Sequence, residues 1–312
     1  MAGSNLGNHT LGWIGTGRMG FPMAARLAKA GGKVAAFNRT RSKAQPLTEY
    51  GATVVDAPID LADRDIVFTM VSASDDLLEV TLGPKGVLSA KGKAPKILID
   101  SSTVSEEASA QLRAECDKRN VQFLAAPVSG NGKVVKAGKL SLVVSGPKAA
   151  FETAKPYLDC LGTGSSYVGE GELARIVKIC HNVLLGVTIQ ALVEITVLAE
   201  KAGVKRHAFL DFINKSVMGS MFTRYKTPSL VNCDWTTTFT PVLLRKDMDL
   251  GLAAAHDLNV PMPVAAATRE IIQALIGNGF TDIDFATLLL QHAKNSALEL
   301  KSENVQVSDG LS

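Results

Sequence analysis

Residues 11–40 read LGWIGTGRMGFPMAARLAKAGGKVAAFNRT, and this stretch decides the fold of the N-terminal half of the chain. A short apolar run at 11–14 meets the glycine pattern at 15–20, and an alanine-rich stretch leads to a second apolar run at 34–37. This order predicts a strand, a glycine-rich turn, a helix and a strand, as in a dinucleotide-binding unit. A lone G-x-G-x-x-G also marks ordinary turns, so the prediction depends on its matching flanks.

Each glycine of the turn has a separate task in such a unit. Gly15 allows the tight turn, Gly17 lets the backbone approach a pyrophosphate, and Gly20 lets the helix pack closely on the strand. The free N–H groups and the dipole at the helix start favour the phosphates. The predicted cofactor contacts in this turn are Gly15, Thr16, Gly17, Arg18 and Met19.

The end of the second strand carries Asn38, Arg39 and Thr40, where an NAD site usually has Asp or Glu. A carboxylate would repel a 2′-phosphate, whereas a guanidinium pairs with it through a planar fork of donors. These three residues are therefore predicted to contact the cofactor, and NADP(H) is favoured over NAD(H). The alternative is that Arg39 and the nearby Arg41 are solvated surface charges.

A chain of 312 residues is long enough for two domains with separate cores, and its composition, 46% apolar and 20% charged, is ordinary for a soluble enzyme. A net charge of +3 without a basic block gives no indication of a nucleic-acid partner. The four cysteines show no metal-ligand spacing, so we expect reduced thiols and no metal site. The polar start, MAGSNLGNHT, predicts a cytoplasmic protein. The apolar stretch at 183–199 contains Gln190 and Glu194, which favours a buried helix over a membrane partner.

The first half alternates strand and helix patterns, which predicts an α/β fold with a Rossmann-type, doubly wound, mostly parallel sheet. Further strands are predicted at 52–55, 66–71, 97–99, 123–125 and 140–145, and helices at 42–50, 75–82 and 105–119. Ser105 followed by two glutamates is a typical helix start. Ligands collect at the carboxyl ends of such strands, so Val71, Ser72 and the loop at 101–103 are predicted to lie near the cofactor.

After about residue 171 the strand patterns almost vanish, which predicts an all-α second domain. One helical pattern covers 172–202 and closes at Gly203, and others are predicted at 205–215, 244–257, 263–278 and 285–300. We therefore expect an NADP-binding Rossmann domain at 10–170, an all-α substrate and oligomerisation domain at 171–301, and flexible tails at 1–9 and 302–312. The long apolar helix predicts a homodimer or homotetramer.

Three further segments hold candidate site residues. The loop at 126–132, APVSGNG, presents a hydroxyl and backbone N–H groups that can bind a carboxylate, although its composition also fits a simple turn. Lys178 and Asn182 share one helix face. Taken alone, Lys178 fits a surface lysine with its stem over apolar groups, and Lys246 with Asp247 fits an exposed pair.

Taken together, these segments resemble the β-hydroxyacid dehydrogenase family over residues 10–300. This family includes 3-hydroxyisobutyrate dehydrogenases, tartronate semialdehyde reductases and glyoxylate/succinic semialdehyde reductases. The matching motifs are GWIGTGRMGFPMAARL at 12–27, DSSTVS at 100–105, APVSGN at 126–131, Gly171 with Lys178 and Asn182, and KDMDL at 246–250. The resemblance implies reversible hydride transfer between NAD(P) and a small, carboxylate-bearing β-hydroxyacid or its aldehyde acid.

The resemblance also implies roles for single residues. Lys178 matches the family's catalytic lysine, which exchanges a proton with the substrate oxygen. The substrate-binding residues are then Ser129, Gly130, Asn131 and Asn182, and Thr103 and Lys246 match residues near the nicotinamide. Asn131 replaces a glycine that is common in the family; we expect the loop to keep its shape because Asn tolerates left-handed backbone angles.

Two alternatives on the same fold are an imine reductase and a non-catalytic NADP-binding protein. Both typically lack the catalytic lysine, so Lys178 favours carbonyl chemistry. A metal-dependent alcohol dehydrogenase is disfavoured because the sequence shows no cluster of ligands. The substrate itself stays open. Its determinants are predicted within 214–250, among Met218, Met221, Phe222, Tyr225, Trp235 and Phe239.

Overall fold

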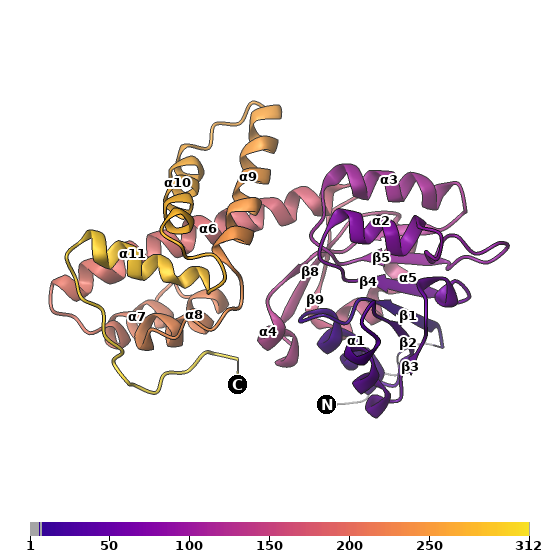
Figure 1. Cartoon of the computed structure of the whole chain (residues 1–312), viewed down its shortest axis with the longest axis horizontal. Helices are drawn as coiled ribbons and strands as arrows, with labels where there is room; N and C mark the ends of the chain where they lie inside the picture. The colour runs from indigo at the N-terminus through magenta and orange to yellow at the C-terminus, as the bar shows by residue number, and fades with distance from the viewer. Residues whose placement is uncertain (1–5, 7, 312) are drawn as a thin grey trace. The chain divides into compact units, whose positions relative to one another are not determined.

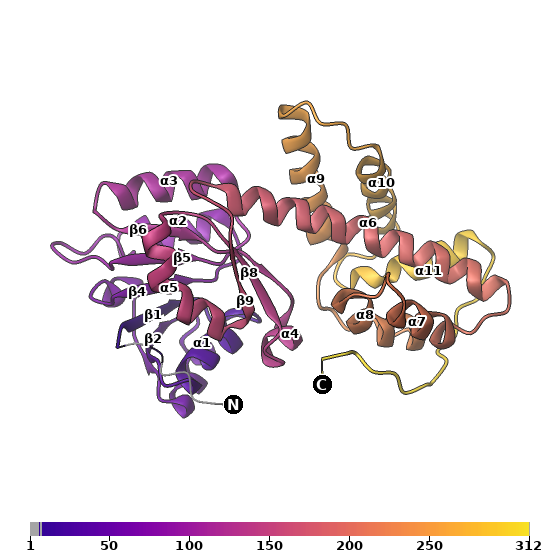
Figure 2. The ribbon, with the colours of Figure 1, turned by 180° about the vertical axis from the view of Figure 1, so that it is seen from behind.

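The structure, a computed structural model, describes residue 6 and residues 8–311 (Figures 1 and 2). The chain forms two compact units that divide between Lys178 and Ile179. We call them the sheet unit (through Lys178) and the helical unit (from Ile179). The division falls inside helix α6 (Leu173–Lys201), slightly after the boundary predicted at residue 171.

The sheet unit is built on a six-stranded parallel sheet in the order β3-β2-β1-β4-β5-β6. Its strands are β1 (Thr10–Ile14), β2 (Lys33–Phe37), β3 (Thr53–Val54), β4 (Ile66–Thr69), β5 (Ile97–Asp100) and β6 (Gln122–Ala125). Because β1 pairs with both β2 and β4, the strand order reverses beside β1. Ligands bind at this kind of switch point, and the predicted doubly wound sheet is confirmed.

Helices cover both faces of this sheet. α1 (Gly20–Lys29) and α5 (Lys148–Cys160) pack on one face, and α2 (Ser74–Leu82) and α3 (Glu106–Asp117) on the other (Figures 1 and 2). Along β4, Ile66 and Phe68 enter the first core and Val67 the second. Successive side chains therefore point to opposite faces of the sheet, and all of them are buried. Both features are expected for a parallel sheet with a layer of helices on each face.

A smaller sheet joins β7 (Val128–Ser129), β8 (Leu140–Val144) and β9 (Gly162–Tyr167). The pairing of β7 with β8 is antiparallel and that of β8 with β9 is parallel. The sequence analysis missed β7, β9, α5 and the short helix α4 (Gly132–Lys136). β9 reads GTGSSY, which has no apolar alternation to mark a strand.

The helical segment predicted at 42–50 is present, but it is not a continuous α-helix. The chain instead forms two 3₁₀ helices, η1 (Arg41–Lys43) and η2 (Gln45–Tyr50), and a third, η3 (Pro58–Leu61), follows β3. Pro46 stands near the start of η2 and lacks the N–H that a continuous α-helix through this position would use.

The helical unit confirms the prediction of an all-α second region. It contains most of α6, then α7 (Arg206–Lys215), α8 (Met221–Asn232), α9 (Pro241–Asp257), α10 (Pro263–Gly277), η4 (Phe285–Thr287) and α11 (Leu288–Asn295). The helix predicted at 285–300 stops early, because Ala297 takes a left-handed φ of 49°. α8 was not predicted, since it contains Pro228, which usually marks a helix end.

Helix α6 ends where its sequence predicts. Gly203 has a φ of 93° and its N–H bonds the Glu200 carbonyl 2.9 Å away. By length and composition alone α6 is apolar enough to cross a membrane, with a mean hydropathy of 1.8 in its most apolar window. Half of that window is buried inside the structure, as in the core helix of a folded domain.

Residues 302–311, predicted to be a flexible tail, run along the helical unit instead. The Glu303 carboxylate accepts hydrogen bonds from the backbone N–H groups of Arg206 (2.8 Å) and His207 (2.9 Å). It thus occupies the N-terminus of α7, where a negative charge is favoured. At the other predicted tail, His9 bonds the Tyr157 hydroxyl at 2.9 Å, and residues 1–5 and 7 lie outside the described residues.

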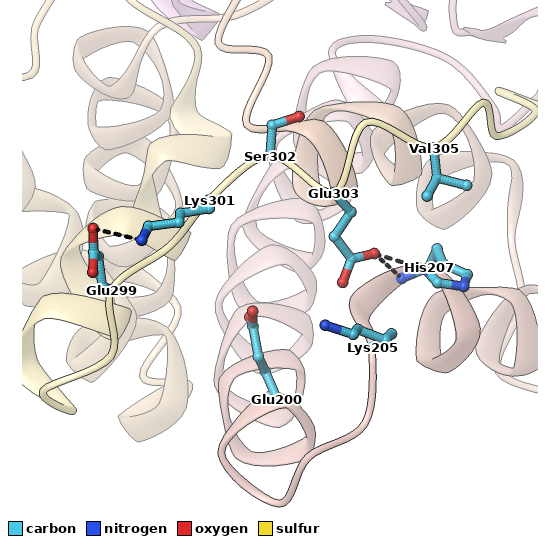
Figure 3. A pocket seen from close by; sticks show the side chains of 8 residues that line it. All are labelled: Glu200, Lys205, His207, Glu299, Lys301, Ser302, Glu303 and Val305. Carbon is cyan, nitrogen blue, oxygen red and sulfur yellow. Dashed lines mark hydrogen bonds and ion pairs between the residues drawn. The ribbon is translucent and has the colours of Figure 1, made fainter.

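An open pocket of about 450 Å³ lies where this C-terminal segment passes α7 (Figure 3). Its lining residues are Glu200, Lys205, His207, Glu299, Lys301, Ser302, Glu303 and Val305. None of the predicted site residues lines it, so this pocket is separate from the predicted chemistry.

Candidate active site

The glycine-rich turn follows β1 at the switch point of the large sheet. A Cβ on Gly15 would lie 2.2 Å from the Met70 carbonyl oxygen, and one on Gly20 would lie 2.0 Å from the Gly15 carbonyl oxygen. A Cβ on Gly17 would meet nothing within 4 Å. Two glycines therefore permit close backbone packing, and the third leaves open space in front of the N-terminus of α1. This arrangement fits a bound pyrophosphate.

Asn38 ties this turn to the end of β2. Its Oδ1 accepts a hydrogen bond from the Thr16 N–H at 2.8 Å, and its Nδ2 donates to the Thr40 carbonyl at 2.9 Å. The Thr16 hydroxyl is buried without a hydrogen-bond partner among the described residues. A buried polar group in that state usually has a ligand or water as its missing partner. The sequence analysis predicted these residues at the cofactor site but not the bond that connects them.

Arg39 projects into solvent, with 88% of its side chain exposed, and its Nη1 lies 3.2 Å from Asp76 Oδ1 in the first turn of α2. Arg41 pairs instead with Asp56 and bonds the Val55 carbonyl. Asp76 is a neighbour that sequence reasoning missed, because 37 residues separate the two partners. Its carboxylate is an internal competitor for any anion that Arg39 would bind.

The loops after β4 and β5 meet as their positions in a parallel sheet predict. The Val71 N–H donates to the Ser102 hydroxyl at 2.9 Å. A γ-carbon of Val71 also lies 3.4 Å from the Cβ position of Gly15. Val71 thus adjoins the glycine-rich turn, Ser72 follows it in the same loop, and Thr103 continues the loop that Ser102 anchors.

The predicted carboxylate loop follows β7. Gly130 has a φ of 133°, and a Cβ there would lie 2.7 Å from Val134 Cγ1, so the position requires glycine. A Cβ on Gly132 would lie 3.2 Å from the Arg18 carbonyl oxygen, which places this loop beside the glycine-rich turn. The sheet unit therefore groups both loops and Ser129, in β7, at one end of its strands.

The expected reason for tolerating Asn131 was wrong. Asn131 has φ −122° and ψ −177°, which is extended and not left-handed backbone. Its Oδ1 caps α4 by accepting hydrogen bonds from the N–H groups of Lys133 (3.0 Å) and Val134 (3.2 Å). The side chain that distinguishes this loop therefore serves to begin a helix.

Lys178 lies on α6, six residues into the helix and half-buried. It belongs to the sheet unit, as do the glycine-rich turn and the carboxylate loop. Arg175, one turn earlier, is buried against Asp100 at the end of β5. Neither Arg175 nor Asp100 was singled out from the sequence, although an arginine among the apolar residues at 173–177 was a visible signal.

Asn182 and Lys246 lie in the helical unit and share one neighbour. The Asn182 amide donates from Nδ2 to Asp247 Oδ2 at 2.6 Å, and its Oδ1 lies 2.9 Å from His181 Nδ1. Lys246 Nζ is 3.3 Å from the other oxygen of Asp247. Asp247 is only 3% exposed, so the pair that looked exposed in the sequence has a buried carboxylate that orients Asn182.

The residues predicted to shape a substrate pocket mainly form core. Phe222 stacks on Phe285 with ring centroids 6.3 Å apart, and Phe239 meets Phe285 edge-on at 6.0 Å. Trp235 also packs against this core, and burial raises the pKa of the Tyr225 phenol. Met218, at 71% exposed, stands outside it.

Two family profiles match the chain almost end to end. The NAD binding domain of 6-phosphogluconate dehydrogenase matches residues 10–169, and the NAD-binding region of NADP-dependent 3-hydroxyisobutyrate dehydrogenase matches residues 172–291. The chain belongs to the β-hydroxyacid dehydrogenase family. It is accordingly an NAD(P)-dependent dehydrogenase or reductase of this family.

Two family members from Arabidopsis thaliana illustrate the relationship. Glyoxylate/succinic semialdehyde reductase 1 is 33% identical over 89% of this chain and 96% of its own length. Glyoxylate/succinic semialdehyde reductase 2, chloroplastic, is 30% identical over 91% of this chain and 79% of its own length.

Solved structures of a 3-hydroxyisobutyrate dehydrogenase and of an imine reductase share the fold. The 3-hydroxyisobutyrate dehydrogenase of Mycobacterium tuberculosis, solved with L-serine, has a TM-score of 0.78 and 26% identity, covering 91% of this chain and 98% of that one. The imine reductase of Myxococcus stipitatus, solved with NADP+, has a TM-score of 0.58 and 22% identity, covering 89% and 98%. The second comparison shows the fold alone.

Proposed function

We propose that this chain interconverts a small β-hydroxyacid and its aldehyde or keto acid with NADP(H) as the hydride carrier. We call residues 38–40, which follow β2, the Arg39 turn. The observation that carries the proposal is that the sheet unit contains the glycine-rich turn, the Arg39 turn, the carboxylate loop and Lys178. The names of the two Arabidopsis relatives support an aldehyde acid as the carbonyl substrate.

When bound, the reduced nicotinamide supplies a hydride to the carbonyl carbon. Lys178 supplies the matching proton: its ammonium Nζ donates to the carbonyl oxygen in reduction, and the neutral amine takes the proton back in oxidation. Such exchange requires a lysine that is partly withdrawn from water, and Lys178 is half-buried on α6.

The substrate carboxylate is held by the Ser129 hydroxyl and the backbone N–H groups that follow it. Asn182, on the next turn of α6 after Lys178, orients the substrate through its amide. Hydrogen bonds with Asp247 and His181 fix that amide in one orientation. Preorganised donors of this kind lower the barrier because they need not reorient during the reaction.

The preference for NADP(H) rests on Arg39. Its charged, exposed side chain stands where the ribose of the cofactor is expected, and no carboxylate occupies the end of β2. Asp76 keeps this preference moderate, because a 2′-phosphate must replace it as the partner of the guanidinium.

A panel of aldehyde acids, assayed with NADPH and with NADH, tests the proposal. The panel comprises glyoxylate, succinic semialdehyde, tartronate semialdehyde and methylmalonate semialdehyde. We expect turnover of at least one, with the higher kcat/KM for NADPH. Reduction of a cyclic imine without reduction of any aldehyde acid would make the chain an imine reductase. NADPH binding without turnover of either would make it a non-catalytic binding protein.

We also propose that the chain forms a homodimer or homotetramer through its helical unit. Leu184, Ile195 and Leu198 on α6 are 65%, 42% and 70% exposed, and their spacing of 11 and 14 residues places them on one helix face. Water-exposed apolar stripes of this kind usually mark an interface. A stable monomer in light scattering at micromolar concentration would contradict this proposal.

A further inference from the structure

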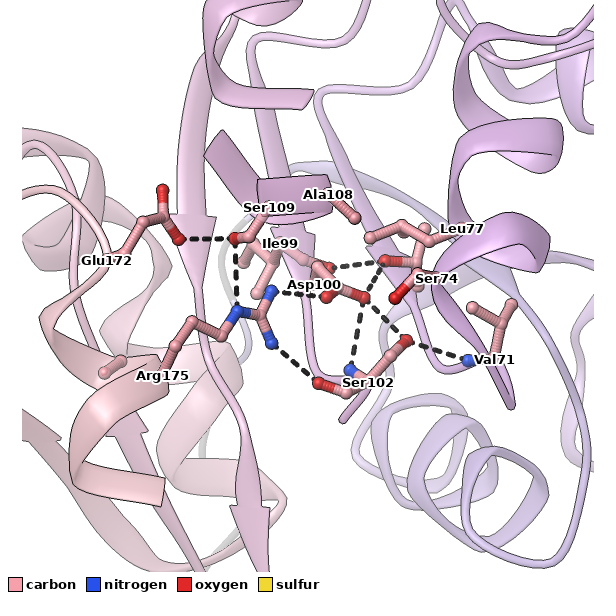
Figure 4. A network of polar contacts seen from close by, with 12 residues as sticks. Val71, Ser74, Leu77, Ile99, Asp100, Ser102, Ala108, Ser109, Glu172 and Arg175 are labelled. Atoms are coloured by element: carbon pink, nitrogen blue, oxygen red, sulfur yellow. Dashed lines mark hydrogen bonds and ion pairs between the residues drawn. The ribbon is translucent and has the colours of Figure 1, made fainter. Parts of the chain in front are cut away.

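Arg175 is a buried guanidinium one turn before Lys178 on α6. Its side chain is 2% exposed and pairs with Asp100, whose side chain is 0% exposed (Figure 4). Nη1 of Arg175 donates to the Ser102 carbonyl at 2.6 Å, and Nε donates to the Ser109 hydroxyl at 3.1 Å. Three nitrogens of one planar fork are therefore bound to three different residues, two at the end of β5 and one in α3, which fixes the side chain in one geometry.

Asp100 extends the same network to the loops beside the cofactor site. Its Oδ1 accepts hydrogen bonds from the hydroxyls of Thr69 (2.6 Å) and Ser102 (2.7 Å), while Oδ2 faces Arg175. The Ser102 hydroxyl in turn accepts from the Val71 N–H at 2.9 Å. One buried carboxylate thus links the loop after β4, the loop after β5 and the first turn of α6.

A second set of contacts holds the same end of α6. The Glu172 carboxylate accepts a hydrogen bond from the Ser109 hydroxyl (Figure 4). It also accepts one from Arg113 Nε at 2.6 Å. The Ser145 hydroxyl accepts a hydrogen bond from the Ala174 N–H at 3.0 Å, which gives one of the otherwise unpaired N–H groups at the start of α6 a buried partner. These contacts fasten the start of α6 to α3 and to the residue after β8, whereas Arg175 also fastens it to the loop after β5.

We propose that Arg175 and Asp100 are positioning residues for the reaction: their ion pair sets where the first turn of α6, and with it Lys178, lies against the loop at 101–103. The inference rests on the proposed role of Lys178. Hydrophobic residues of similar size often replace a buried ion pair without loss of stability, so a pair with this many polar contacts is better explained by geometry than by stability. A reacting group displaced by about 1 Å can lose about 100-fold in rate.

Arg175→Lys tests the proposal because it keeps the charge and loses the fork. The assay follows NADPH oxidation with glyoxylate or succinic semialdehyde, whichever the wild-type protein reduces faster. We expect kcat to fall about 10- to 100-fold, with the NADPH dissociation constant little changed. With NADPH deuterated at the transferred position, the isotope effect on kcat should rise, because the chemical step becomes slower than product release.

A double-mutant cycle separates positioning from general damage. If Arg175 acts through Lys178, then adding Arg175→Lys to Lys178→Met should change the residual kcat by less than about twofold. A double variant whose fold-loss in kcat equals the product of the two single fold-losses would overturn the proposal, because Arg175 would then act independently of the lysine. If Arg175→Lys does not fold, the same cycle is run with the isosteric Asp100→Asn.

Arg206→Lys is the matched control. Arg206, at the start of α7, is also fully buried, and its guanidinium is bonded to the Glu200 carboxylate. We expect it to lower Tm and leave kcat unchanged. Equal kcat losses in Arg206→Lys and Arg175→Lys would overturn the proposal, because the contacts around Arg175 and Asp100 would then affect the rate only through stability. Full activity in Lys178→Met would refute the proposed role of Lys178 and this inference with it, while the proposed function is refuted only if the wild-type protein reduces no aldehyde acid. Loss in Lys178→Met with full activity in Arg175→Lys would refute only this inference.

Discussion

Two ion pairs in this protein are equally buried, yet their hydrogen bonds lead to different places. Asp100 with Arg175 lies in the sheet unit and Asp284 with Lys226 in the helical unit, and in both pairs the cation is 2% and the carboxylate 0% exposed. Asp100 connects two cofactor loops to the helix that carries Lys178. Asp284 bonds Lys226, the Thr238 hydroxyl and the Ala286 N–H, all within the helical unit.

The difference shows that burial alone does not reveal what a charged pair does. In both pairs, removing the two charges from water costs free energy, and hydrogen bonds with polar neighbours are needed to offset that cost. Only the contacts of Asp100 reach residues predicted to bind cofactor. We therefore expect damage to the first pair to appear in the rate and damage to the second to appear in stability.

The largest expected effect is at the reacting group itself. Lys178→Met should lower kcat by about 10²–10⁴-fold, because it removes the proposed general acid and base. NADPH affinity, measured by fluorescence titration, should stay near that of the wild-type protein. Lys178→Arg should not restore turnover, since a guanidinium holds its proton too tightly to exchange it near neutral pH.

A stability effect comes next and concerns the second pair. Lys226→Met leaves the Asp284 carboxylate buried without its cation and should lower the free energy of unfolding by about 3–5 kcal/mol. Urea unfolding of the whole chain measures this loss. Retained stability would mean that Thr238 and the Ala286 N–H suffice to hold the charge.

The same pair predicts an acid-sensitive component of stability. Burial disfavours the charged form of Asp284, but Lys226 and the surrounding hydrogen bonds outweigh it and hold the pKa of this carboxyl below its ordinary value. The stabilisation is therefore complete above the ordinary pKa of about 3.9 and is lost as the pH falls through the lower folded-state pKa. Asp284→Asn should flatten this part of the pH profile.

The carboxylate loop offers a smaller, local effect. Ser129→Ala should raise KM for an aldehyde acid about 10-fold or more, since a hydrogen bond to a charged group contributes about 1.5–3 kcal/mol. NADPH affinity should change less. A large loss of NADPH affinity with a normal KM would assign Ser129 to the cofactor instead.

The smallest expected effect concerns the Arg39 turn and the choice between NADPH and NADH. Arg39→Ala should cost about 1.5–3 kcal/mol in kcat/KM with NADPH and little with NADH. Asp76→Asn removes the competing carboxylate and should shift the NADPH/NADH ratio modestly in the opposite direction. An unchanged ratio in both variants would exclude this turn as the determinant of cofactor choice.

The sequence predicts the sheet unit better than the helical unit. Buried parallel strands and the glycine pattern leave local signals, so β1, β2, β4 and β5 were found within a few residues of their ends. α8 was missed because its Pro228 reads as a break, and β9 because glycine and serine carry no alternation. Tertiary packing decides both elements.

In the candidate site, too, local motifs were predicted from the sequence and contacts between distant residues were not. The cofactor turn and Lys178 were visible because motif spacing records them. The contacts of Asp76 with Arg39, of Asp247 with Asn182 and of Asp100 with Arg175 were not, because the partners lie 37, 65 and 75 residues apart in the chain. No local pattern shows which distant charges a fold brings together.

One side-by-side measurement tests the account most directly: kcat and Tm for Asp100→Asn and Asp284→Asn, each an isosteric loss of one buried negative charge. The account predicts that both variants lower Tm, that Asp100→Asn lowers kcat by about tenfold or more, and that Asp284→Asn leaves kcat unchanged. Equal kcat in the two variants would contradict the claim that the Asp100–Arg175 pair positions the reaction while the Asp284–Lys226 pair only holds the fold.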